Sequence, residues 1–159
     1  MSETSSRGKL KFVVDAMLKN IVSWLRILGY DVVYCGGEDE EVLRIAGKDD
    51  RIILTMDRGL ALTSLRRGLK VMLITENDVS NILAKLAMKY GISLDFDARN
   101  TRCPVCNHEL YLAKTEERDE WICPNCGKKY WKGSHWRNIS KTIEAAKRKL
   151  MEGASKSRS

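Results

Sequence analysis

The sequence predicts an α/β protein. A small doubly wound parallel sheet over residues 9–97 is followed by a cysteine-containing segment over 98–136 and a basic amphipathic helix over 137–152. Three observations support this order. Short apolar runs alternate four times with segments of helical periodicity, two CxxC pairs follow, and the last periodic segment is rich in lysine and arginine. Nearly continuous apolar strands are typical of a parallel sheet that is covered on both faces.

The four predicted strands are short, apolar and rich in β-branched residues, and they cover residues 10–14, 32–34, 52–54 and 71–74. The predicted helices have apolar side chains three or four positions apart, and they cover residues 17–28, 42–47, 60–65 and 79–90. Gly29 and Gly91 follow the first and the last of these helices, at positions where glycine often ends a helix. The alternation stops after Asp97, which predicts a domain boundary there.

The formal charge is divided unevenly along the chain. Residues 1–97 contain 14 basic and 14 acidic side chains, whereas residues 98–159 contain 14 basic and 7 acidic ones, so the second part carries the whole net charge of +7. A basic appendage beside a domain that bears acids predicts a polyanionic partner, with nucleic acid ahead of a membrane surface. The alternative is that the basic part is only a solvated tail.

The two ends of the chain and its hydropathy predict where the protein is found. No apolar run approaches the length of about 20 residues that a membrane-spanning helix needs, and no secretory segment follows the start. We therefore expect a soluble, cytoplasmic protein without a membrane partner. Residues 1–8 and 153–159 are small, polar and charged, and we expect them to be disordered tails.

Acidic residues follow every predicted strand. They are Asp15 after the first strand, Glu38, Asp39 and Glu40 after the second, Asp57 after the third, and Glu76 and Asp78 after the fourth. Because the carboxyl ends of parallel strands meet at one edge of the sheet, these side chains are expected to gather there. For any single position, helix capping by aspartate is an equally physical explanation.

Several carboxylates gathered at one edge repel each other unless a cation lies between them. Mg²⁺ and Mn²⁺ prefer carboxylate oxygen, and one or two such ions could activate water and stabilise the leaving oxygen of a phosphodiester. The sequence contains no phosphate-binding glycine motif and no Ser/His/Asp set. Metal-assisted phosphodiester hydrolysis is therefore the predicted chemistry.

Two CxxC pairs, separated by 16 residues, predict one structural zinc ion held by Cys103, Cys106, Cys123 and Cys126. Four thiolates complete a tetrahedral coordination shell, so this site has no open position for catalysis. A redox-active CxxC is the alternative, but the thioredoxin-like context that this chemistry needs is absent. Cys35 is left over and is expected to be a buried strand residue.

The segment after the second CxxC pair interleaves bases with aromatic residues. Its predicted RNA contacts are Lys128, Lys129, Trp131, Lys132, His135, Trp136 and Arg137. Aromatic rings can stack on unpaired bases while lysine and arginine meet phosphates. The alternative is that the tryptophans pack this segment onto the α/β domain.

Several motifs resemble the Mut-seven C-terminal RNase family. They lie at residues 11–18, 24–26, 29–31, 51–60, 102–107 and 130–136. The resemblance implies a PIN-like nuclease fold with a fused zinc ribbon, and metal-dependent RNA cleavage by acids at the sheet edge. Carried over by position, those acids are Asp15, Asp39 and Asp57, with Asp78 as a fourth. Arg26 and Arg58 lie within the matching motifs and are added to the predicted RNA contacts.

The chain departs from the family pattern at residues 19–23 and at Met56, both near the predicted substrate site. The sequence thus predicts a ribonuclease that uses Mg²⁺ or Mn²⁺ at the acids, cuts RNA internally, and binds RNA through its basic zinc ribbon and C-terminal helix. The alternative is a non-catalytic protein that binds RNA, ribosomal RNA or the ribosome and retains only the fold. A nuclease that acts on DNA is a third candidate.

Overall fold

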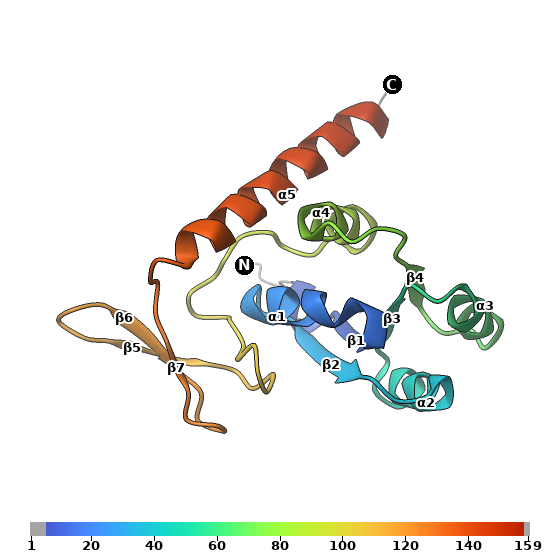
Figure 1. The fold of residues 1–159 in the computed structure, drawn as a ribbon, viewed down its shortest axis with the longest axis horizontal. Coiled ribbons are helices and arrows are strands. Elements are labelled where there is room, and N and C mark those ends of the chain that lie inside the picture. Colours follow the sequence, from blue (N-terminus) through green and yellow to red (C-terminus); the bar gives the residue numbers. More distant parts are fainter. Residues whose placement is uncertain (1–5, 158–159) are drawn as a thin grey trace.

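The computed structural model describes residues 6–157 and contains two sheets (Figure 1). The first sheet is parallel, with the strand order β2-β1-β3-β4. Its strands are β1 (Lys11–Asp15), β2 (Asp31–Cys35), β3 (Ile52–Thr55) and β4 (Val71–Leu73). The helices between and after them are α1 (Lys19–Ile27), α2 (Asp39–Asp49), α3 (Arg58–Arg66) and α4 (Val79–Tyr90). The predicted α/β alternation is therefore confirmed.

Helices cover both faces of the parallel sheet. On one face, Phe12 and Val14 pack with buried residues of α1 and α4. On the other face, Val13 and Ile53 pack with buried residues of α2 and α3. Successive residues of β1 thus enter two different cores, which is why Phe12, Val13 and Val14 are all apolar. This arrangement confirms the predicted doubly wound fold class.

The chain adds β2 on one side of β1 and then adds β3 and β4 on the other side. β2 pairs with one side of β1, where Asp15 lies beside Cys35, and β3 pairs with the other side, where Val14 lies beside Leu54. In sheets of this type, the crevice for ligands forms at the carboxyl ends of the strands where this change of side occurs. By that rule, the ligand position expected here is at the ends of β1 and β3, next to Asp15 and Thr55.

The second sheet is antiparallel, with the order β5-β6-β7. Its strands are β5 (Tyr111–Lys114), β6 (Asp119–Ile122) and β7 (Lys129–Tyr130). It is fixed to the first domain through α1 and β2, because Arg102 N donates to Arg26 O at 2.9 Å and Val32 N donates to Asn107 Oδ1 at 3.0 Å. Trp121 is buried, and its Nε1 donates to Ala98 O at 2.8 Å.

The last helix, α5 (Trp136–Ser157), runs along α4 (Figure 1). Ile143 and Ala146 are buried against the core on the α4 side, while Lys147 pairs with Asp95 at 2.8 Å. The helix is longer than the predicted range of 137–152 and ends at Ser157. No helix in the part of the chain that the structure describes is long and apolar enough to cross a bilayer.

The ends of the chain differ in part from the expected tails. Residues Ser6–Gly8 form a 3-10 turn, and Arg7 Nε donates to Leu28 O at 2.7 Å. Residues 153–157 belong to α5. These two short segments therefore have helical backbone where the sequence predicted disordered tails. The rest of both predicted tails, residues 1–5 and 158–159, lies outside the described residues.

Candidate functional site

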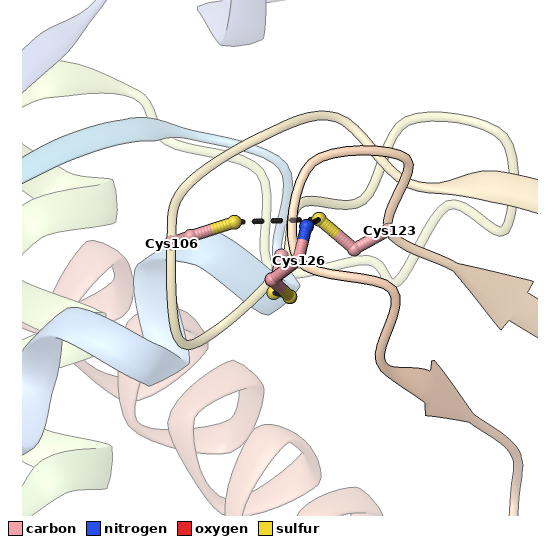
Figure 2. A group of neighbouring side chains, drawn as sticks. Cys106, Cys123 and Cys126 are labelled. Atoms are coloured by element: carbon pink, nitrogen blue, oxygen red, sulfur yellow. Dashed lines mark hydrogen bonds between the residues drawn. The ribbon is translucent and has the colours of Figure 1, made fainter.

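The four paired cysteines come together in one cluster, called here the cysteine cluster (Cys103, Cys106, Cys123 and Cys126). Their sulfur atoms all lie within 4.8 Å of one another. Figure 2 shows the side chains of Cys106, Cys123 and Cys126 pointing toward a shared space between two loops. The shortest approach is 3.3 Å, between the sulfurs of Cys106 and Cys123. Four sulfur donors at this spacing fit a tetrahedral zinc site, and they could hold one zinc ion.

Two tight backbone loops position the sulfurs. Asn107 N donates to Cys103 O at 2.9 Å, and Gly127 N donates to Cys123 O at 2.8 Å. Asn107 and Gly127 have φ angles of 73° and 79°, in the left-handed region that asparagine and glycine tolerate best. The residue types after each CxxC pair are therefore explained by the turn that the loop requires.

The surroundings of the cysteine cluster favour a thiolate at one position. Hydrogen bonds from the Asn125 side chain and the His108 backbone lower the pKa of Cys106 to about 6. Burial raises the pKa of the neighbouring Cys123 to about 11. Tyr130 Oη lies 3.2 Å from the sulfur of Cys103. Because the thiolate is the form that binds metal, the lowered pKa suits Cys106 to act as a metal ligand.

At the carboxyl edge of the parallel sheet, one hydroxyl connects two of the predicted acids. Thr55 Oγ1 donates to Asp15 Oδ2 at 2.5 Å and accepts from Asp57 N at 2.9 Å. Thr55 is fully buried. Its hydroxyl therefore holds the Asp15 carboxylate in one orientation and fixes the backbone at Asp57.

Asp39 joins these two acids from the start of α2. The pKa of Asp39 is raised, first by partial desolvation and then by the negative charges of Asp57 and Asp15. Asp15, Asp39 and Asp57 are called here the acid edge. Within residues 6–157, the cysteine cluster is the group of three or more potential ligands whose atoms lie close enough together to hold a metal ion, and the acid edge is not such a group.

One of these acids also serves the fold by capping a helix, whereas another has a buried oxygen without a hydrogen-bond partner. Asp57 Oδ1 accepts from Leu60 N at 3.1 Å, so it caps α3. Asp15 Oδ1 is buried, and among the described residues it is the buried side-chain oxygen that has no hydrogen-bond partner. An orphaned carboxylate oxygen is costly in a folded protein unless a cation or water satisfies it.

Asp78, the fourth predicted acid, lies apart from the acid edge. Its Oδ1 accepts from Ser80 Oγ at 2.6 Å and from Asn81 N at 3.1 Å, and it lies 3.5 Å from Lys149 Nζ. The hydrogen bond from Ser80, then those from Asn81, lower the pKa of Asp78. Glu76 on the same loop pairs with Lys85. Capping therefore explains the hydrogen bonds of Asp78, and the role of Asp78 in a shared acidic site stays a prediction.

Arg26, a predicted RNA contact, is buried inside the protein. Its Nη2 donates to Val32 O at 2.8 Å and its Nη1 donates to Pro104 O at 2.9 Å. Burial lowers the pKa of Arg26, and the thiols of Cys103 and Cys106 oppose that shift. A guanidinium whose donors are taken by backbone carbonyls is not free to bind phosphate. The predicted RNA contact at Arg26 is therefore not supported, and this residue joins α1 to the first cysteine loop instead.

The other predicted RNA contacts lie at or near the surface. Exposed side chains belong to Arg58, Lys128, Lys129, Trp131, Lys132, His135 and Arg137. Trp131 has Arg118 stacked 4.0 Å from its ring centroid and is 40% exposed. Trp136 is half-buried and packs edge-on against Phe96, with 4.8 Å between ring centroids. Of the two explanations for the tryptophans, packing therefore applies to Trp136, whereas Trp131 keeps an open face.

Sequence reasoning missed Thr55 as a site residue. The available signal was a hydroxyl at the last position of an otherwise apolar strand, directly before the acidic loop. It also missed the junction between the two sheets, where Asp31 accepts from both Arg51 and Asn107. No periodicity predicts that contact, because its members lie in three different elements.

The comparisons with known proteins agree with this geometry. A family model described as the Mut7-C RNAse domain matches residues 10–143. No curated protein and no solved structure matches the chain. The matched range includes the parallel sheet with its acid edge, the cysteine cluster and the first part of α5. The resemblance noted in the sequence is thereby confirmed, and this chain belongs to the Mut7-C RNAse domain family.

Proposed function

We propose that the protein is a metal-dependent ribonuclease that cuts RNA internally at the acid edge. The observation that carries the proposal is the Asp15–Thr55–Asp57 connection at the crevice of the sheet, with Asp39 electrostatically coupled to both acids. Membership of an RNase domain family supports the substrate class. Asp39 and Asp57 are exposed, so a polymer could reach them without entering by one end, which suits internal cleavage.

The acids present fit a hard divalent cation. The buried Oδ1 of Asp15 lacks a partner among the described residues, and the charges of Asp15 and Asp57 raise the pKa of Asp39. Both features are relieved by a cation between the carboxylates. Asp15, Asp39 and Asp57 are therefore the proposed ligands of one or two Mg²⁺ or Mn²⁺ ions. When bound, such an ion supplies Lewis acidity and lowers the pKa of a water molecule.

The chain's own groups have separate roles in this proposal. Thr55 orients the Asp15 carboxylate, and the Leu60 amide orients Asp57, so neither acid has to reorganise when RNA arrives. Arg58 is exposed directly beside Asp57 and can pair with a phosphate oxygen of the substrate. We place Asp78 outside the reaction, as a helix cap.

The basic second part of the chain is proposed to hold RNA. Lys128, Lys129 and Lys132 are exposed on the segment that follows the cysteine cluster, and Trp131 offers an open ring. Their contacts with phosphate would be sequence-independent and weakened by salt. The cysteine cluster is proposed to bind one structural zinc ion that holds this segment in shape.

Two aspartates provide a matched pair of variants for testing this function. Asp57 and Asp78 both cap helices through Oδ1, but only Asp57 is part of the acid edge. Asparagine is also a good N-cap, so Asp57→Asn and Asp78→Asn keep the caps and remove one charge each. We expect Asp57→Asn to lower the rate of cleavage of end-labelled RNA with Mn²⁺ by at least about a hundredfold. We expect Asp78→Asn to cleave like the wild type.

The assay starts with protein that has been passed over a gel-filtration column in metal-free buffer, and cleavage is followed before and after Mn²⁺ is added. Internal products that need Mn²⁺ support the proposal. Cleavage that is unchanged in Asp57→Asn contradicts it. Salt-sensitive RNA binding without products from any of the three proteins would favour the non-catalytic RNA- or ribosome-binding function, because the exposed lysines do not depend on the acids.

A further inference from the structure

A groove lies between the α/β domain and the first cysteine loop, and it has a volume of about 700 Å³. We call it the junction groove. Its polar and exposed lining includes Lys19, Asn20 and Ser23 of α1, Tyr34 of β2, and Val105 and Cys106 of the cysteine loop. A volume of this size falls within the usual range of roughly 300–1,000 Å³ for ligand sites.

The junction groove begins beside the acid edge. Lys19 opens α1, four residues after Asp15. Tyr34 pairs with Val14 in the sheet, and the next residue of β2, Cys35, lies beside Asp15. A strand of substrate whose phosphodiester lies at the acid edge could therefore continue into this groove.

The lining presents an aromatic face, a cation and free hydrogen-bonding groups. Tyr34 is 36% exposed, and the Lys19 ammonium lies 5.4 Å from its ring centroid. In the part of the chain that the structure describes, the side chains of Asn20 and Ser23 make no hydrogen bond to protein. An aromatic ring beside a cation and polar groups is the combination that binds unpaired bases and their phosphates.

A peptide strand is a poorer occupant, although β2 is the outer strand of the sheet. Its backbone groups at Val32 are already taken, since Val32 N donates to Asn107 Oδ1 at 3.0 Å and Val32 O accepts from Arg26 at 2.8 Å. Addition of a peptide to a sheet edge depends on such groups being open. The edge of β2 is thus blocked by the chain's own side chains.

We infer that the junction groove binds a single-stranded segment of the RNA substrate, with a base stacked on Tyr34 and a phosphate at Lys19. This inference rests on the proposed ribonuclease function for the identity of the substrate. It adds a binding site that is separate from the acids and from the exposed lysines after the cysteine cluster. It also implies that the enzyme prefers RNA with an unpaired segment next to the cut, because a paired base cannot stack on a side chain in a groove.

The test measures binding rather than cleavage. Full-length protein carrying Asp57→Asn, which removes turnover, is titrated into a fluorescently labelled single-stranded RNA and, separately, into an RNA duplex. We expect Tyr34→Ala in this background to weaken binding of the single strand about tenfold and to leave duplex binding unchanged. Tyr34→Phe keeps the ring and is expected to bind like the background. Tyr111→Ala removes an aromatic ring that is 66% exposed on β5, away from the groove, and is the matched control.

A second variant tests the cation. Lys19→Ala is expected to reduce the slope of log affinity against log salt by about one for single-stranded RNA. Unchanged single-strand affinity in Tyr34→Ala, or an equal loss in Tyr111→Ala, would overturn the inference. The two proposals fail separately. Loss of binding in Tyr34→Ala together with an inactive wild type would remove the ribonuclease function and keep the groove. An active wild type whose Tyr34→Ala variant binds single-stranded RNA normally would keep the ribonuclease function and remove the groove.

Discussion

The cysteine cluster and the acid edge both gather groups that become negatively charged, but the protein treats them in opposite ways. The four sulfurs lie within 4.8 Å of each other, Cys103 and Cys123 are fully buried, and two tight turns fix their backbones. The three carboxylates form no such close group among the described residues, Asp39 and Asp57 are exposed, and one buried oxygen of Asp15 has no hydrogen-bond partner.

This difference separates a structural site from a reactive one. A closed shell of four sulfurs leaves no position for substrate and converts metal binding into folding free energy. An open set of carboxylates keeps unsatisfied charge, which costs stability but leaves room for a cation, water and phosphate. In the proposed function, the same chain uses one cluster to hold its shape and leaves the other open for reaction.

The largest expected effect comes from breaking the closed cluster. Cys123→Ser replaces a fully buried sulfur. We expect bound zinc to fall from about one equivalent to almost none, and the second sheet to unfold, because structural sites of this kind contribute on the order of 10 kcal/mol. Zinc content by mass spectrometry and the near-UV signal of Trp121 measure the two effects. Cys35→Ala, at a buried cysteine outside the cluster, is the control and should keep its zinc. Normal zinc content in Cys123→Ser would contradict the four-sulfur assignment.

A smaller effect is expected at the acid edge when the Thr55 hydroxyl is removed. Thr55→Val keeps the shape of the buried side chain but removes the hydroxyl between Asp15 and Asp57. We expect the cleavage rate to fall about tenfold and the free energy of unfolding to fall by about 1–2 kcal/mol. Thr55→Ser restores the hydroxyl and should recover most of the rate. If the serine variant cleaved no better than the valine variant, Thr55 would have no positioning role.

The smallest effect is expected at the junction around Asp31, which accepts hydrogen bonds from Arg51 and Asn107. Burial raises the pKa of Asp31, but hydrogen bonds from Arg51 and Asn107 outweigh it and hold the pKa below its usual value of 3.8. A lowered folded pKa means that this stabilisation is present above the unfolded value and is lost as pH falls through the folded one. Asp31→Asn is expected to cost about 1 kcal/mol of unfolding free energy at pH 7, and the difference from wild type should shrink below about pH 4.

Denaturant unfolding at several pH values measures this difference. Release of zinc in acid affects both proteins, so the difference between them is the quantity to follow. Asp119→Asn removes one charge at an exposed position on β6 and serves as the control. A gap between Asp31→Asn and wild type that stays constant from pH 7 to pH 3 would show that the carboxylate charge is not what stabilises the junction.

The sequence by itself determined the parts of this protein that depend on local patterns. The strands and helices follow from the spacing of apolar residues, because a strand buried on both faces and a helix buried on one leave different periodicities. The cysteine cluster follows from two CxxC pairs, since a closed tetrahedral site needs its ligands at short, fixed spacings. The order of the acidic loops also follows, because parallel strands deliver their carboxyl ends to one edge.

Only the tertiary structure decided how similar residues divide between different roles. Asp57 and Asp78 both follow a strand and cap a helix, yet Asp57 is linked through Thr55 to Asp15 while Asp78 accepts from Ser80 and pairs with Lys149. The buried position of Arg26 and the junction groove likewise arise where α1, β2 and the first cysteine loop meet. These outcomes depend on contacts between residues as far as 78 positions apart, and local periodicity carries no information about such contacts.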